Sequence, residues 1–166
     1  MKRLMALFML AIFAISFAAT PILAATFDED ESIKAKYQEK KEWYLEAVQK
    51  YETVKREYQA AKAKYLAGKT AENTETVIEE GRSFLLNGLD VLDANLDYAE
   101  TRISLYDFLS NQDELLDEIA ENKEKIPGLR EETEAAESIE DLMAVADKVK
   151  NYASDVDVVI KKSMGE

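Results

Sequence analysis

The sequence contains no cysteine and no histidine among its 166 residues. The missing thiolate and imidazole groups are the ligands on which zinc, copper and haem sites mostly depend. Disulfides are excluded as well, and so are the Ser-His and Cys-His pairs that activate most nucleophiles. Catalysis would depend on carboxylates, lysine or tyrosine alone, so we expect a protein that is not an enzyme and carries no cofactor.

Glycine and proline are also scarce, with five and two residues respectively. This composition favours long helices over the turn-rich patterns of sheet proteins, and no segment alternates polar and apolar residues as a half-buried strand does. The length gives room for one modest domain. The prediction is an all-α domain, a long antiparallel helical hairpin extended to a three- to four-helix bundle with coiled-coil-like packing.

The N-terminus has the layout of an export signal. Lys2 and Arg3 precede a stretch from Leu4 to Phe27 that carries no charge, and the small residues Ala24 and Ala25 are candidate cleavage positions. The same stretch is long enough to cross a bilayer, so an uncleaved N-terminal anchor is the alternative. Both alternatives place the rest of the chain outside the cytoplasm: secreted, periplasmic or at the cell surface.

These signals divide the chain into three parts. Residues 1–25 are predicted to be the signal peptide or anchor, and residues 26–31 an acidic linker. Residues 32–166 are then the helical bundle domain.

A seven-residue repeat of tyrosine marks the stretch from Ser32 to Leu66, which contains no glycine or proline. This period is typical of a helix with one buried seam, and Gly68 is placed to end it. The seam consists of Tyr37, Tyr44, Tyr51, Tyr58 and Tyr65, with Ile33 before the first tyrosine and Lys40, Ala47, Val54 and Ala61 between successive ones. The flanking positions carry Lys34, Lys36, Lys41, Lys50, Lys55, Lys62 and Lys64, which indicates a basic margin beside the seam.

A second long helix is predicted from Asn73 or Thr74 to about Leu109. Its apolar stripe is too wide for a two-stranded coiled coil and suits a bundle that covers it from two sides. Gly81 and Gly88 lie one heptad apart within it, although a glycine inside a helix costs about 1 kcal/mol relative to alanine. In an antiparallel hairpin with the first helix, we expect these glycines to seat the rings of Tyr65 and Tyr58. The stripe comprises Ile78, Leu85, Leu92, Ala99 and Tyr106, joined by Leu89, Leu96 and Ile103.

Two shorter helical stretches follow. The third keeps its rhythm through Pro127, which predicts either one bent helix or a helix to Lys125 and a short piece from Leu129 to Glu137. The sequence Ser138-Ile139-Glu140-Asp141 resembles a capping box with aspartate in place of glutamate. It predicts the start of a last helix that ends near Ser163.

Charge is distributed unevenly along a chain whose formal net charge is -13. Residues 32–66 hold nine Lys or Arg against five Glu, whereas residues 67–166 hold ten against twenty-five Asp or Glu. We expect the basic first helix to pair with acidic margins on the later helices. The acidic total argues against binding to nucleic acid or to an anionic membrane face, since both need a basic surface.

Two sets of residues are candidate sites. Trp43 lies beside the seam with Lys41, Lys50 and Lys55, and an exposed aromatic there would be a partner-binding anchor. Carboxylates also line one side of the second helix, where they form either a solvated face that pairs with lysines or an oxygen-only site for calcium or magnesium. A di-iron site is excluded because the recurring Glu-x-x-His motif of such sites requires histidine. The cation candidates are Asp90, Asp93, Asp97 and Glu100, followed by Asp107.

These features predict an exported helical bundle that acts as a non-catalytic interaction or structural module in the cell envelope or extracellular space. The expected partner is another protein or a second copy of the chain, and contact with a membrane is expected only through an uncleaved N-terminal segment. A periplasmic-type holdase chaperone and a carboxylate-based divalent-cation binding protein are the alternatives.

Overall fold

The computed structural model describes residues 31–105 and 111–164, which form four helices and contain no strand. They are α2 (Glu31–Ala67), α3 (Ala71–Ser104), α4 (Gln112–Glu134) and α5 (Ile139–Met164). The all-α prediction is confirmed. The predicted export segment, Tyr106, Asp107 and the expected helix end at Leu109 lie outside the described residues. Within the described ranges, no helix is long and apolar enough to span a membrane.

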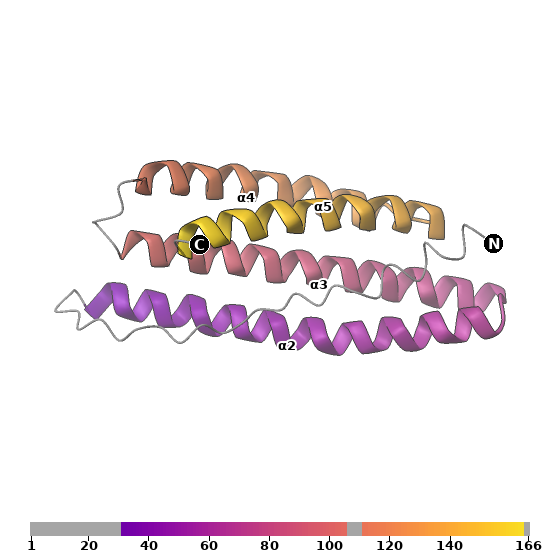
Figure 1. Cartoon of the computed structure of the whole chain (residues 1–166). Helices are drawn as coiled ribbons and strands as arrows, with labels where there is room; N and C mark the ends of the chain where they lie inside the picture. Colours follow the sequence, from indigo (N-terminus) through magenta and orange to yellow (C-terminus); the bar gives the residue numbers. More distant parts are fainter. Residues whose placement is uncertain (1–30, 106–110, 165–166) are drawn as a thin grey trace.

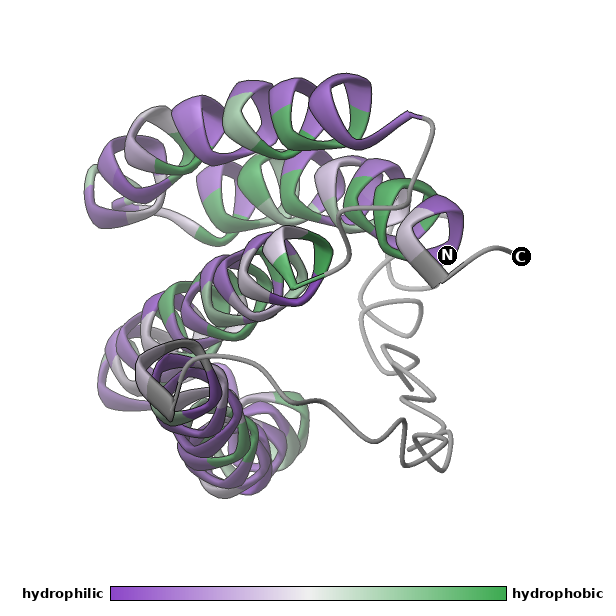
Figure 2. Cartoon of the chain, turned by 90° about the vertical axis from the view of Figure 1, so that its left-hand side faces the viewer, coloured by the Kyte–Doolittle hydropathy of each residue, from purple (hydrophilic) through white to green (hydrophobic). Residues whose placement is uncertain are grey.

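The helix α3 is the centre of the arrangement. Successive helices run antiparallel, with α2 on one side of α3 and the shorter pair α4 and α5 on the other (Figure 1). The end-on view shows the resulting layers and the apolar stripes of the helices turned inward (Figure 2). The helix α2 has its main packing partner in α3, whereas α4 and α5 pack against both α3 and each other.

The tyrosine seam faces α3 as predicted. Tyr51 and Tyr58 are buried and Phe84 of α3 stacks against both rings, with centroid separations of 5.2 Å in each case. The small seam residues Ala47, Val54 and Ala61 are buried too. Tyr37, Tyr44 and Tyr65 are half-buried, and the side chain of Ile33 lies outside the described ones.

The glycines of α3 lie against tyrosine rings of α2, but each glycine contacts the tyrosine one heptad before the predicted one. A Cβ atom on Gly81 would lie 3.4 Å from Cε2 of Tyr58, and one on Gly88 would lie 3.6 Å from Cε2 of Tyr51. The turn explains the shift: Tyr58 lies eleven residues before Lys69 and Gly81 twelve after it, so an antiparallel pair folded at Lys69 brings these two together.

The turn itself is shorter than predicted. The helix α3 begins at Ala71 rather than at Asn73 or Thr74, because the side chain of Thr70 caps it by accepting a hydrogen bond from the Asn73 amide at 3.1 Å. The Asn73 side chain donates instead to the Gly68 carbonyl at 2.6 Å, which ties the start of α3 to the end of α2.

The helix α4 runs unbroken through Pro127, so the single-helix alternative is the correct one. Pro127 is exposed, and solvent can satisfy the Lys123 carbonyl that has lost its helical donor. The helix α5 begins with the predicted capping box: the Asp141 amide donates to Ser138 Oγ at 3.1 Å, and the Ser138 amide donates to Asp141 Oδ2 at 3.0 Å.

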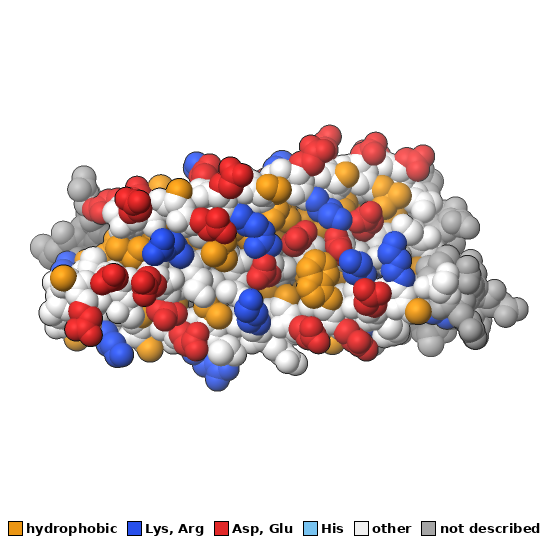
Figure 3. All heavy atoms as spheres, turned by 180° about the vertical axis from the view of Figure 1, so that it is seen from behind, with side chains coloured by type: hydrophobic (Ala, Val, Ile, Leu, Met, Phe, Trp, Pro, Cys, Tyr) orange, Lys and Arg blue, Asp and Glu red, His pale blue; other side chains and the backbone are white. Residues whose placement is uncertain are grey.

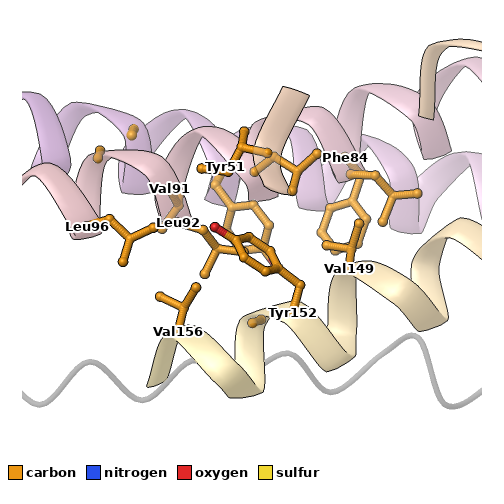
Figure 4. Packing of buried hydrophobic residues seen from close by; sticks show 14 of the residues in the cluster. Tyr51, Phe84, Val91, Leu92, Leu96, Val149, Tyr152 and Val156 are labelled. Carbon is orange, nitrogen blue, oxygen red and sulfur yellow. The ribbon is translucent and has the colours of Figure 1, made fainter. Parts of the chain in front are cut away.

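The main core lies between α3 and the α4–α5 pair. Leu89, Leu96 and Ile103 of α3 are almost completely buried, as is Ile119 of α4. From α5, Tyr152 and Val156 point toward Leu92 and Leu96, and Val149 points toward Phe84 (Figure 4). The Tyr152 hydroxyl donates to the Asn122 carbonyl of α4 at 3.0 Å, which satisfies its buried polar group.

The three helical glycines give a test of this packing. A Cβ on Gly81 would lie 2.9 Å from Leu142 Cδ1, whereas Gly88 has only an ordinary contact and Gly128 of α4 has open space around it. We expect Gly88→Ala and Gly128→Ala to raise the free energy of unfolding by up to about 1 kcal/mol, since alanine favours helix. In Gly81→Ala, overpacking against Leu142 and Tyr58 should cancel or reverse that gain. Urea unfolding of the three variants measures the order, and a Gly81→Ala variant as stable as Gly128→Ala would contradict the close contact.

The tyrosine seam gives a second prediction, at alkaline pH. Burial, followed by the nearby Glu52 charge, raises the pKa of Tyr51 to about 12, and burial also raises the pKa of Tyr58. Because the folded pKa lies above the unfolded value of about 10, the contribution of Tyr51 to stability is complete below pH 10 and is lost as the pH rises through about 12.

Ultraviolet titration of the phenolates measures this behaviour. We expect a class of tyrosines that ionises well after free tyrosine, and Tyr51→Phe should remove one member of that class. Ionisation of all eight tyrosines near the ordinary pKa, while circular dichroism still reports a folded helix, would show that the seam is open to solvent.

Candidate functional site

The predicted partner-binding residues lie on α2 in different environments. Trp43 is 38% exposed, and the Lys40 ammonium lies 5.0 Å from the centroid of its ring. Lys50 is the most extended, with a side chain 66% exposed and a contact of 3.9 Å to Asp90. Lys55 pairs with Glu52 at 2.9 Å along its own helix, and Lys41 is half-buried. Only Trp43 and Lys50 therefore present much of their side chains to an incoming partner.

The carboxylates of α3 hold the neighbouring helices by ion pairs. Asp97 accepts from Lys40 of α2 at 2.7 Å and from Lys123 of α4 at 2.5 Å, and Lys123 also pairs with Glu100 at 2.9 Å. Asp97 is thus the point at which three helices are joined electrostatically. Its side chain is only 15% exposed, so solvent screens these contacts less than it screens surface pairs.

A second set of contacts lies one heptad away. Arg130 of α4 contacts Asp90 at 2.7 Å and Asp93 at 3.9 Å, and Asp90 also faces Lys50 of α2. In the view opposite to Figure 1, acidic and basic side chains interleave along the length of the molecule (Figure 3). The predicted cation candidates are therefore placed as partners of lysine and arginine.

The predicted pairing of α2 with acidic neighbours is confirmed in outline and differs in detail. Among the flanking lysines, Lys50 reaches an α3 carboxylate, but the shorter contact comes from Lys40 within the seam. Sequence reasoning missed Lys123 and Arg130, which supply the α4 side. A signal existed, because Lys123 and Arg130 are seven residues apart, as are Asp90 and Asp97.

The surroundings push the pKa values of two neighbouring aspartates in opposite directions. Burial alone would raise the pKa of Asp97, but hydrogen bonds and charges from Lys123 and Lys40 outweigh it and hold the pKa below its usual value. Burial, followed by the Asp97 charge, raises the pKa of Asp93, and Arg130 offsets this only in part. Burial would lower the pKa of Lys123, but its hydrogen bonds to Asp97 and Glu100 hold that pKa above its usual value.

Within residues 31–105 and 111–164, no group of three or more acidic side chains is arranged to hold a metal ion. A shallow depression of about 530 Å³ lies beside the first turns of α3, next to the α2–α3 turn. Lys69, Arg82, Glu75 and Glu137 are among its lining residues, so both charge signs are mixed there. Neither feature brings together a nucleophile and a base or a set of metal ligands.

The ion pairs around Asp97 predict a specific loss of stability. Asp97→Asn removes the charge that Lys40 and Lys123 share and should lower the free energy of unfolding at pH 7 by about 1 to 2 kcal/mol. Because the folded pKa of Asp97 lies below its unfolded value of about 3.9, the wild-type contribution is present above that value and is lost as the pH falls through the folded pKa.

Asp93→Asn is the matched control, since it makes the same chemical change one turn away on α3. The pKa of Asp93 is raised, so removing its charge should leave the stability at pH 7 unchanged within about 0.5 kcal/mol or increase it. Urea unfolding at pH 7 and pH 3.5 measures both variants. Equal losses for the two would contradict the assignment of Asp97 as the junction.

Comparison with known proteins adds no family to this description. No family model matches the chain, and no match is found among curated proteins or solved structures.

Proposed function

We propose that this chain is an exported, non-catalytic interaction module that presents the outer side of α2 to a protein partner in the cell envelope or extracellular space. The observation that carries the proposal is the one-sided support of α2. This helix is 37 residues long and has its main packing partner in α3. Within residues 31–105 and 111–164, exposed residues recur along the side of α2 that faces away from α3.

The accessible side carries the features of a docking surface. Leu45 is 48% exposed, and Trp43, two residues before it and therefore on a different face of the helix, is 38% exposed. Lys50, one heptad after Trp43 and therefore on the same face of the helix, keeps 66% of its side chain exposed. Exposed aromatic and aliphatic anchors within a polar rim are typical of helix-in-groove recognition, in which an amphipathic partner buries them. The basic rim favours a partner that is acidic around its apolar face.

The export half of the proposal is supported by the sequence alone. The basic start, the uncharged stretch and the small residues at its end match the pattern of a secretory signal. The absence of cysteine and histidine supports the non-catalytic part of the proposal, because it removes the commonest general base and both the Ser-His and Cys-His nucleophile pairs.

The holdase alternative has no specific support. A holdase needs a contiguous exposed apolar surface. The large exposed apolar residues that the structure describes are Trp43, Leu45, Leu66 and Val158, which are spread over α2 and α5. Trp43 and Leu45 are close in the chain but lie on different faces of α2, so these residues form no contiguous apolar surface.

Site-specific photo-cross-linking in cells that express the full-length chain tests the proposal. A photoreactive phenylalanine analogue replaces Leu45 on α2 or Val158 on α5, a matched control with a 51% exposed apolar side chain. We expect a discrete adduct in the extracytoplasmic fraction from position 45 and none from position 158. Circular dichroism of both purified variants confirms that they fold.

Three outcomes would contradict the proposal. The first is the absence of an adduct from position 45, and the second is an equal yield from both positions. The third is retention of the chain in the cytoplasmic fraction, which would contradict export of the chain. The adducts would then still test whether α2 is the partner-binding surface.

A further inference from the structure

Two tyrosines from different helices meet near the open end of the α2–α3 hairpin. The hydroxyl oxygens of Tyr37 on α2 and Tyr98 on α3 are 2.5 Å apart, within hydrogen-bond distance. Their ring centroids are separated by 5.1 Å and the rings are inclined by 40°. Both side chains are half-buried, so part of each ring remains accessible from solvent.

The surroundings hold this pair in place. Tyr44 stacks on Tyr98 with a centroid separation of 6.2 Å and nearly parallel rings. Asp97, the residue directly before Tyr98, is fixed by Lys40, and this ion pair sets the register of α2 against α3 at the same level. The two phenol rings are therefore kept adjacent by contacts other than their own hydrogen bond.

We propose that Tyr37 and Tyr98 form an oxidative cross-linking site, at which a haem peroxidase using hydrogen peroxide joins the two rings into a dityrosine. This proposal goes beyond the interaction surface on α2 and does not depend on it. Each phenol loses one electron and one proton to give a phenoxyl radical. The two radicals couple through a ring carbon next to each hydroxyl-bearing carbon.

The atoms and electrons balance with one molecule of peroxide. The new carbon–carbon bond forms, and each coupled ring then moves the hydrogen of its bonded carbon to its oxygen to become aromatic again. The chain loses two hydrogen atoms in total. Hydrogen peroxide accepts the two electrons and two protons through the peroxidase and becomes two molecules of water.

Two properties of the chain favour this reaction at this place. The sequence has no cysteine, so no thiol within the chain can reduce a tyrosyl radical before it couples. The fold also holds two phenols side by side, and this high effective concentration favours coupling within one molecule over coupling between molecules. The product would link residues 61 positions apart and join α2 covalently to α3.

The burial of the pair determines the protonation state in which the phenols react. Burial, followed by the hydrogen bond and charge of Tyr98, raises the pKa of Tyr37 well above its ordinary value, and the charges of Lys41 and Arg102 reduce this effect only in part. At neutral pH the Tyr37 phenol is therefore protonated, and its oxidation removes a proton together with the electron.

The test treats the purified full-length chain with a haem peroxidase and one equivalent of hydrogen peroxide. We expect a monomeric product that has lost two hydrogen atoms by intact mass, shows dityrosine fluorescence, and yields a cross-linked peptide containing positions 37 and 98. The cross-linked product should also melt at a higher temperature than the untreated chain, because the link restricts the unfolded state.

Four variants locate the site. Tyr37→Phe and Tyr98→Phe should each abolish the intramolecular product. Tyr65→Phe, a half-buried member of the same seam far from the pair, should leave the yield unchanged, and so should Tyr44→Phe if Tyr37 is the ring that couples. Circular dichroism shows whether each variant is folded.

Any of three results would overturn the proposal. One is the absence of dityrosine in the folded wild-type chain, and another is a product that consists only of dimers joined between molecules. The third is an undiminished intramolecular yield in a folded Tyr37→Phe variant, which would place the reactive pair elsewhere.

Discussion

The structure depends on one constraint along the α2–α3 contact, where large aromatic rings pack against small residues. Phe84 is held between Tyr51 and Tyr58, and Gly81 and Gly88 leave room for those two tyrosines. Since α2 has its main support in α3, this one seam decides where α2 lies and which of its residues face outward. Aromatic burial of this kind contributes more than any pair of surface charges can.

The ion pairs between the helices select their arrangement more than they stabilise it. Asp97 and Asp90 each contact cations from both α2 and α4, so α3 carries the contacts that relate the two outer layers. Ion pairs of this kind add little net stability, because the charges lose hydration when they pair, but they disfavour arrangements that leave a charge without a partner. They are therefore best understood as selecting one register and orientation among the ways in which four amphipathic helices can pack.

Much of the fold was predictable because its signals are local. The seven-residue repeat of tyrosine identified the buried side of α2, and Ser138 with Asp141 identified the start of α5. The partners of Gly81 and Gly88 were wrong by one heptad because the register of a hairpin depends on the length of its turn. That length was set by Thr70, a cap that competed with Asn73 and Thr74 for the same role.

The candidate site was harder to predict because its contacts join helices distant in the sequence. The row of α3 carboxylates was recognised, but its α4 partners Lys123 and Arg130 become neighbours only once α4 folds back over α3. Lys40 was assigned to the seam and its ion pair with Asp97 was not foreseen. The number of residues in a turn, more than helix propensity, limited the accuracy of these assignments.

The one-sided support of α2 has a consequence for how the molecule opens. Detaching α2 breaks the contact with α3 and the ion pairs of Lys40 and Lys50, whereas α3, α4 and α5 keep the mutual contacts of their own core. Local unfolding occurs where the fewest stabilising contacts have to be broken. We therefore expect the backbone amides of α2 to exchange their hydrogens with solvent sooner than those in the middle of α3.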